Sequence, residues 1–172
     1  TTIFGSSCLG PQGAPSAPVS TSRRPRVRTL SSDGRFFLKG KSLSASDWWD
    51  VFWNNPKPII AQIQGFCIAG GLATATFCDL RICSEDAKFG APEICTGGPY
   101  IPAIWQWVVG MTKARELLYT GNLIDAEEAK RLDLVNKVVP VEELDAAVER
   151  QAATIAKLPA ATVEDNKKLI NA

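Results

Sequence analysis

The hydrophobic pattern of this chain is strongest between Pro58 and Glu93. This stretch opens with a nearly continuous apolar run, residues 59–61 followed by Ile63. β-Branched residues suit a fully covered sheet, so the run predicts a strand that is buried on both faces. Gly65 ends this strand.

A second short apolar run, residues 66–68, follows at once and leads into Gly70 and Gly71. The next residues, 72–78, are mostly small, and small side chains let a helix pack closely. The pattern therefore predicts that the chain passes from strand to helix at the glycine pair.

Beyond residue 93 the apolar positions recur every three or four residues, which predicts helices. Proline, glycine and acidic residues mark the expected helix ends, and Asp125 with Glu128 has capping-box spacing. The expected elements are a helix from Pro102 to Gly110, a helix from Thr112 to Gly121, a helix from Asp125 to Leu132, a strand from Leu134 to Val139, a helix from Val141 to Lys157 and a helix from Thr162 to Ile170. Strands and helices alternate, so the predicted fold class is α/β, with short parallel strands covered by helices.

Residues 1–46 differ from the rest in composition. Gly, Pro, Ser and Arg dominate residues 5–35, and such a segment cannot bury enough apolar surface to fold alone. We therefore expect an irregular or mobile segment over residues 1–46 and a folded domain over residues 47–172. An arginine cluster at residues 23–28 is consistent with a solvated arm or with a phosphate-binding segment, which in RNA binding would show a steep dependence on salt.

Overall composition narrows the function classes. The chain has 172 residues, 45% hydrophobic and 22% charged, with a net charge of +1. That balance gives no general reason to expect a nucleic acid or a membrane as partner. No apolar run approaches the roughly 20 residues of a spanning helix, and no charged-then-apolar signal segment opens the sequence. We expect a soluble, cytoplasmic protein.

Histidine is absent from the sequence, which excludes a Ser-His-Asp or Cys-His nucleophile within it, as well as histidine metal ligands. The five cysteines have no usual metal spacing, and four of them lie in apolar surroundings. We therefore expect buried, reduced thiols and no metal site.

The glycine pair is the first candidate for chemistry. The first N–H groups of a helix have no partner within it and carry the positive end of the helix dipole. Glycine lets a ligand approach them, so Gly70 is a candidate donor to an oxyanion. Alternatively, Gly70 and Gly71 only allow close helix packing.

Residues 56–93, PKPIIAQIQGFCIAGGLATATFCDLRICSEDAKFGAPE, resemble the signature region of the crotonase superfamily, also called the enoyl-CoA hydratase/isomerase family. The resemblance extends over roughly residues 54–170, through the segments Gly110–Ala114, Leu118–Gly121, Ala126–Ala129, Leu134–Asn136 and Val138–Pro140. It implies a spiral of ββα units and assembly into homotrimers or hexamers. The N-terminal and C-terminal parts of the family fold are missing or atypical here, so we expect a central fragment, a processed form or one part of a longer protein.

The resemblance also implies a substrate, an acyl-CoA thioester, with coenzyme A as part of the substrate and no separate cofactor. Gly70 would donate to the thioester oxygen, and the neighbouring substrate-binding residues would be Ile68, Ala69, Gly71 and Tyr100. In the family a loop nearer the N-terminus supplies the second N–H group. Its usual pattern is absent, and the nearest candidate is Ser6, which is far from Gly70 in the sequence.

In the family two glutamates flank the thioester when water is added to a double bond. This chain has Ala73 at the first position and Glu93 at the second. A single carboxylate suffices to move a proton between two carbons, and isomerases of the family are similar in keeping only the second glutamate. Glu93 is therefore the expected acid/base, with isomerisation ahead of hydration. The alternative is a non-catalytic CoA-binding or oligomer-assembly homologue.

Overall fold

The computed structural model describes residues 2–7, 36–38, 41–43, 45–97 and 104–172. Over these residues no helix is both long and apolar enough to cross a membrane.

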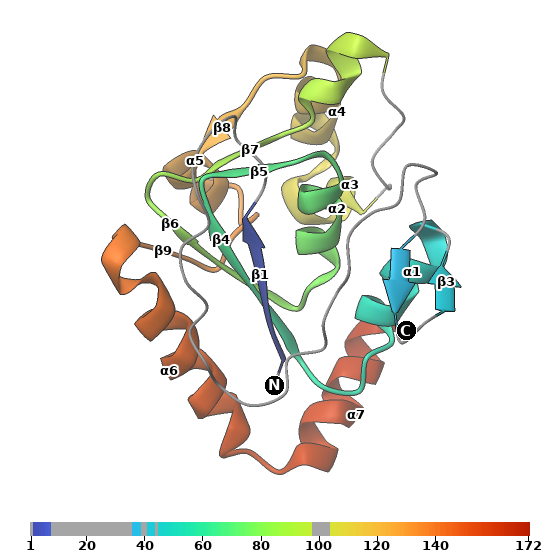
Figure 1. Cartoon of the computed structure of the whole chain (residues 1–172), viewed down its shortest axis with the longest axis vertical. Coiled ribbons are helices and arrows are strands. Elements are labelled where there is room, and N and C mark those ends of the chain that lie inside the picture. Colours follow the sequence, from blue (N-terminus) through green and yellow to red (C-terminus); the bar gives the residue numbers. More distant parts are fainter. Residues whose placement is uncertain (1, 8–35, 39–40, 44, 98–103) are drawn as a thin grey trace.

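Two sheets form the centre of the molecule (Figure 1). A four-stranded, wholly parallel sheet has the order β1 (Thr2–Ser7), β4 (Ile59–Gln64), β6 (Leu80–Ser84) and β9 (Lys137–Val139). A three-stranded sheet has the order β5 (Phe66–Ile68), β7 (Lys88–Gly90) and β8 (Ile124–Asp125). Separately, β2 (Phe36–Leu38) and β3 (Lys41–Leu43) form an antiparallel pair.

Consecutive strands divide between the two sheets. β4 lies in the first sheet and β5 in the second, and β6 and β7 repeat this division. Only Gly65 separates β4 from β5, and its φ of +65° is a conformation that glycine adopts without steric cost. Helix α2 (Ala69–Phe77) follows the first pair of strands. The 3-10 helix η1 (Pro92–Thr96), α3 (Trp105–Val109) and α4 (Met111–Thr120) follow the second pair. The predicted α/β class and its ββα units are thus observed.

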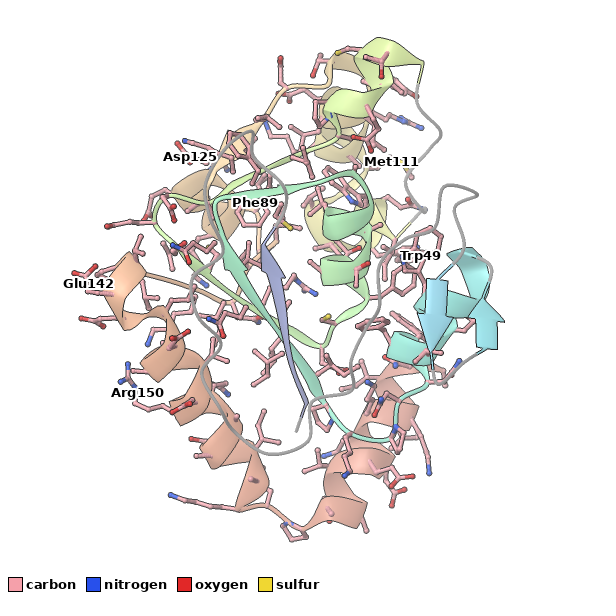
Figure 2. The ribbon with its side chains drawn as sticks, viewed as in Figure 1. Trp49, Phe89, Met111, Asp125, Glu142 and Arg150 are labelled. Atoms are coloured by element: carbon pink, nitrogen blue, oxygen red, sulfur yellow. The ribbon has the colours of Figure 1, made fainter. Side chains whose placement is uncertain are left out.

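The parallel sheet is buried on both faces. On β4, Ile59, Ala61 and Ile63 belong to the main hydrophobic cluster, together with residues of α2. Ile60 points the other way, into a second cluster formed with α6 (Leu144–Ala156). Outward-facing residues of η2 (Val141–Glu143) and α6, such as Glu142 and Arg150, are exposed (Figure 2). This two-sided burial explains why the β4 sequence is continuously apolar rather than alternating.

Most predicted elements downstream are present, with shifted ends. The helices expected at residues 112–121, 125–132 and 162–170 correspond to α4, α5 (Ala126–Arg131) and α7 (Ala160–Asn171). Asp125 caps α5 by accepting a hydrogen bond from the Glu128 N–H, 2.8 Å. The strand expected from Leu134 was wrong at its start, because Leu134 is fully buried in the main cluster before β9 begins. Pro102 lies outside the described residues.

The N-terminal expectation was wrong for part of residues 1–46. Residues 2–7 form β1, whose pairing with β4 is continuous from Thr2 opposite Ile59 to Ser7 opposite Gln64. β2 and β3 also lie within this segment, and α1 (Ala45–Trp53) begins before residue 47. Composition missed β1 because the backbone bonds of an edge strand come from its neighbour and do not depend on its own side chains. The arginine cluster lies outside the described residues, and the division of the chain at residue 46 stays a prediction.

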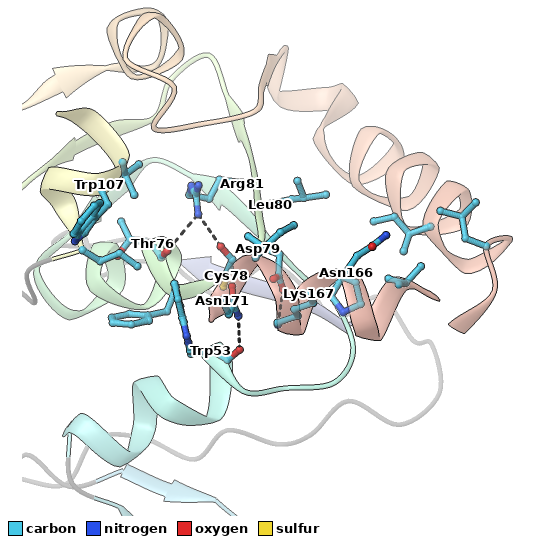
Figure 3. Close-up of a pocket in the computed structure, with 18 residues that line it drawn as sticks. Trp53, Thr76, Cys78, Asp79, Leu80, Arg81, Trp107, Asn166, Lys167 and Asn171 are labelled. Atoms are coloured by element: carbon cyan, nitrogen blue, oxygen red, sulfur yellow. Dashed lines mark hydrogen bonds and ion pairs between the residues drawn. The ribbon is translucent and has the colours of Figure 1, made fainter. Parts of the chain in front are cut away.

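Helix α7 is fixed to the centre of the molecule by a partly buried ion pair (Figure 3). Lys167 is 7% exposed; its Nζ lies 2.8 Å from Oδ2 of Asp79 and donates to the carbonyl oxygen of Phe52, 3.2 Å. The same carboxylate oxygen accepts the N–H of Ile59 at 2.7 Å. One ion pair therefore ties α7 to the start of β4 and to the C-terminal end of α1.

We expect Lys167→Met to lower the free energy of unfolding by about 2–4 kcal/mol, since it leaves the Asp79 carboxylate without its counter-ion. Denaturant unfolding measures the loss. The control is Lys168→Met, because the Lys168 side chain is 65% exposed and pairs with Glu164 on the surface of the same helix. That change should cost less than about 0.5 kcal/mol. Equal losses in the two variants would contradict the role given to the ion pair.

Candidate active site

The segments that follow β5 and β7 both leave the three-stranded sheet at the same edge. β5 and β7 are parallel neighbours, with Ile68 opposite Gly90. Parallel strands that end in register deliver their next residues to the same edge, about 5 Å apart. The start of α2, at Ala69 and Gly70, therefore lies beside the segment that carries Glu93. Gly70 thus follows β5 and Glu93 follows β7, and these two strands are parallel neighbours.

The start of α2 has an unusual backbone. Ala69 has a φ of +49°, in the left-handed region that residues with a Cβ rarely adopt. The helix continues from Gly70, and a left-handed residue followed by a helical one turns successive N–H groups toward one point, which makes an anion-binding nest. Such strain persists only where the surrounding structure imposes it, and it concentrates at functional sites.

These N–H groups lack the usual helix cap. The N-cap residue, Ile68, offers no side-chain hydrogen bond, and the first turn of α2 holds no acidic residue. At the other end of α2, by contrast, Arg81 donates from Nη1 to the carbonyl oxygen of Cys78 at 2.7 Å, with longer bonds to those of Ala75 and Thr76. The positive end of this helix is thus left available, within the part of the chain that is described, while the negative end is neutralised.

Gly70 is exposed, and a Cβ built on it would meet no described atom within 4 Å. Among the described residues, no side chain or backbone atom packs closely against Gly70, which favours its role as a donor over the packing alternative. Gly71 is half-buried, as are Ile68 and Ala69. What the open space beside Gly70 permits is the approach of a ligand to the helix backbone.

Glu93 is half-buried in η1. Its Oε2 is inaccessible to solvent and has no hydrogen-bond partner among the described residues. A carboxylate oxygen in this state costs free energy, because neither water nor a donor compensates its lost hydration. An unsatisfied buried group of this kind calls for an explanation, and a site that completes its contacts with a ligand is one.

Ala73 is 1% exposed and lies one turn after Gly70 on α2. The next residue, Thr74, donates its hydroxyl to the carbonyl oxygen of Gly70 at 2.8 Å. No acid therefore stands on this turn of α2. The acidic candidate that remains is Glu93, in the 3-10 helix that follows β7.

Of the two remaining site candidates, the structure describes Ser6 but not Tyr100. Tyr100 lies outside the described residues, so its predicted role stays a prediction. Ser6 is far from Gly70 in sequence, but it lies opposite Ile63 in the β1–β4 pairing, near the end of the parallel strands that precedes α2. Sequence reasoning took this separation as an obstacle and missed that β1 returns beside β4. The pairing signal was weak because β1 contains Gly5 and two serines.

The cysteines are mainly structural. Cys67, Cys78 and Cys83 are buried free thiols, as expected. Burial raises the pKa of Cys78 and that of Cys83 to about 12, so both stay protonated near neutral pH. Cys95 is exposed, contrary to the expectation of burial, because η1 packs on α4 at the surface. Cys8 lies outside the described residues. Arg81 is half-buried, and the loss of hydration around its guanidinium lowers its pKa.

Comparison with known proteins identifies the architecture. The family model for enoyl-CoA hydratase/isomerase matches residues 37–172. A short-chain-enoyl-CoA hydratase of Clostridioides difficile is 42% identical over 120 residues, which is 68% of this chain and 77% of that protein. A crotonyl-CoA hydratase of Syntrophomonas wolfei subsp. wolfei is 42% identical over 106 residues, 58% of this chain and 39% of that protein.

Solved structures agree. An enoyl-CoA hydratase/isomerase from Xanthobacter autotrophicus Py2 superposes with a TM-score of 0.71 at 35% identity, over 74% of this chain and 48% of that one. A Thermobifida fusca YX protein solved in complex with CoA gives a TM-score of 0.68 at 32% identity, over 73% of this chain and 51% of that one. The chain thus spans about half the length of these structures, and its fold is the crotonase fold.

We expect Ala69→Gly to raise the free energy of unfolding by about 0.5–1 kcal/mol, since glycine removes the steric cost of a positive φ. Ala75→Gly is the control, because Ala75 lies in the same helix, is 1% exposed and does not have a positive φ. That variant should lose about 1 kcal/mol or more. Denaturant unfolding compares the two variants, and a loss at residue 69 as large as that at residue 75 would rule out strain.

Proposed function

The chain belongs to the enoyl-CoA hydratase/isomerase family, the crotonase superfamily, and on that premise we propose that the protein binds an acyl-CoA thioester and transfers a proton on its acyl group. The observation that carries the proposal is the buried Oε2 of Glu93, which lacks a described partner at the same sheet edge as the uncapped start of α2. The CoA held by the Thermobifida structure supports the substrate class.

The start of α2 would stabilise the charge that develops during the reaction. The thioester oxygen would accept a hydrogen bond from the N–H of Gly70, and its negative charge would face the positive end of the helix. A second N–H would come from the end of β1, near Ser6, which pairs with Ile63 of β4. One donor of this kind contributes about 2.7–4 kcal/mol to transition-state stabilisation.

Glu93 would act first as base and then as acid. Its carboxylate takes a proton from C2 of a 3-enoyl thioester, and the electron pair of that C–H bond forms an enolate whose charge rests on the thioester oxygen. The protonated Glu93 then returns the proton to C4. The carbonyl re-forms and the double bond moves from C3–C4 to C2–C3, so atoms and charge balance with a single acid.

Ala73 favours this isomerisation over hydration, because the resemblance gives hydration two carboxylates and residue 73 supplies none. The same residue supports the alternative, a CoA-binding or assembly homologue without catalysis. No cofactor beyond the CoA of the substrate is required. Assembly into homotrimers or hexamers and a cytoplasmic location stay predictions.

We expect Glu93→Gln to lower kcat on a 3-enoyl-CoA by about 10²–10⁴-fold, since the amide cannot carry the proton. Binding of the thioester, measured by calorimetry, should be retained. Glu142→Gln, at an exposed position on η2, should leave the rate unchanged. An unchanged kcat in Glu93→Gln would refute the acid/base role. Thioester binding without turnover in the unmodified protein would favour the non-catalytic alternative.

Gly70→Ala separates ligand access from folding. The added Cβ meets no described atom, and alanine suits a helix better than glycine, so the free energy of unfolding should stay the same or rise by up to about 1 kcal/mol. The value of kcat/KM should nevertheless fall at least about 10²-fold, because the methyl group displaces the thioester oxygen from the helix N–H groups.

Gly90→Ala provides the contrast to Gly70→Ala. Its Cβ would stand 2.7 Å from the backbone oxygen of Asn122, so this variant should lose stability as well as activity. Full activity in Gly70→Ala would show that the ligand does not approach that residue.

A further inference from the structure

Residue 73 faces a packed core and not an open site. Ala73 is 1% exposed and belongs to the main hydrophobic cluster. Interiors are packed at the density of organic crystals, so the space around a buried methyl group belongs to a neighbour. Whether residue 73 could carry a larger side chain depends on which neighbouring side chain fills the space around its methyl group.

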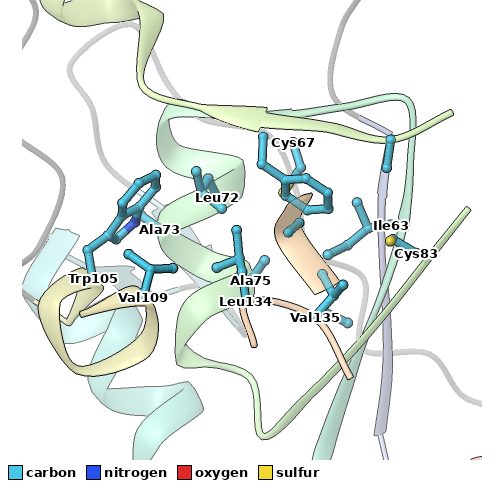
Figure 4. Packing of buried hydrophobic residues seen from close by; sticks show 14 of the residues in the cluster. Ile63, Cys67, Leu72, Ala73, Ala75, Cys83, Trp105, Val109, Leu134 and Val135 are labelled. Atoms are coloured by element: carbon cyan, nitrogen blue, oxygen red, sulfur yellow. The ribbon is translucent and has the colours of Figure 1, made fainter. Parts of the chain in front are cut away.

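Trp105, the first residue of α3, is the largest side chain that could fill that space. It is 1% exposed and is the largest fully buried side chain among the described residues. It belongs to the same cluster as Ala73, and Figure 4 shows its indole turned toward Ala73 on α2, with Val109 one turn further along α3. A small residue on one helix thus faces a very large one on the other.

A buried tryptophan usually donates its N–H to an acceptor, but Nε1 of Trp105 has no hydrogen-bond partner in the described part of the chain. Within that part of the chain, the indole contributes volume and apolar contact to the cluster. A glutamate at residue 73 would add two methylene groups and a carboxylate to a region that the indole already occupies.

We propose that Trp105 occupies the space that a carboxylate on residue 73 would need, so that the pair Ala73 and Trp105 restricts the site to one acid. This inference rests on the proposed function, in which the missing first carboxylate separates isomerisation from hydration. It makes Trp105 a residue that determines reaction specificity through its bulk. Ala73→Glu alone cannot then restore hydration, whereas the same change with a smaller residue at 105 can.

The first test measures melting temperatures of four full-length proteins: the unmodified chain, Ala73→Glu, Trp105→Leu and the double variant. Ala73→Glu should melt at least about 5 °C lower than the unmodified chain, from overpacking and a buried charge. In the Trp105→Leu background the same substitution should cost less than half as much, because leucine leaves room for the new side chain. An equal cost in both backgrounds would overturn the proposal.

Ala75→Glu is the matched control. Ala75 is also 1% exposed and lies on α2, but two residues along a helix from residue 73, and so on another face. A glutamate there should cost the same whether residue 105 is tryptophan or leucine. Relief at residue 75 as large as at residue 73 would mean that Trp105→Leu merely loosens the core, and would also overturn the proposal.

The second test measures hydration of a trans-2-enoyl-CoA, in which the oxygen of water bonds to C3 and a proton is delivered to C2. The double variant should hydrate this substrate at least about 10-fold faster than either single variant or the unmodified chain. Hydration by Ala73→Glu alone, at the rate of the double variant, would refute the role of Trp105. If the melting temperatures show the coupling and no variant turns over any enoyl-CoA, the proposed function fails while the packing relation stands.

Discussion

The parallel pairing of β5 with β7 is the constraint on which the site depends. Each strand has only three residues, yet the register of Ile68 opposite Gly90 fixes where the chain leaves the sheet after each of them. The segment after β5 begins α2, and the segment after β7 begins η1. A shift of one residue in this pairing would turn every side chain of the strand to the opposite face and separate Gly70 from Glu93.

Two features at this edge are costly to the folded state: the positive φ of Ala69 and the buried Oε2 of Glu93, which has no hydrogen-bond partner in the described part of the chain. Each costs on the order of 1–3 kcal/mol. Contacts elsewhere offset them, since β4 is buried on both faces and Arg81 satisfies carbonyl oxygens at the far end of α2. Proteins often hold a strained functional site in this way, with the stability supplied by the surrounding core.

Reaction chemistry in this fold is set by a few positions on a shared scaffold. The chain has the crotonase fold over the part it shares with longer relatives, and residue 73, where the resemblance implies a first acid, is an alanine. If Trp105 fills the space beside that alanine, this difference involves two helices and a change in packing. A fold of this kind supports several reactions because such exchanges leave the sheet intact.

Local patterns of residues predict much of the architecture. The β-branched run of β4, the glycine at residue 65 and the caps of α4 and α5 are local signals, so they placed strands and helices close to where they occur. The sequence also identified Gly70 and Glu93 as candidates, through residue types and a family resemblance, but it could not tell close packing from open space at Gly70.

The remaining points depend on contacts between distant segments. The structure pairs β1 with β4 and β5 with β7, and it puts Trp105 and Ala73 in one buried cluster. It also set the positive φ of Ala69 and left Oε2 of Glu93 without a described partner. These features depend on segments that are distant in the chain, and the free energy of such contacts comes from packing and strand pairing, which no local pattern of residues encodes.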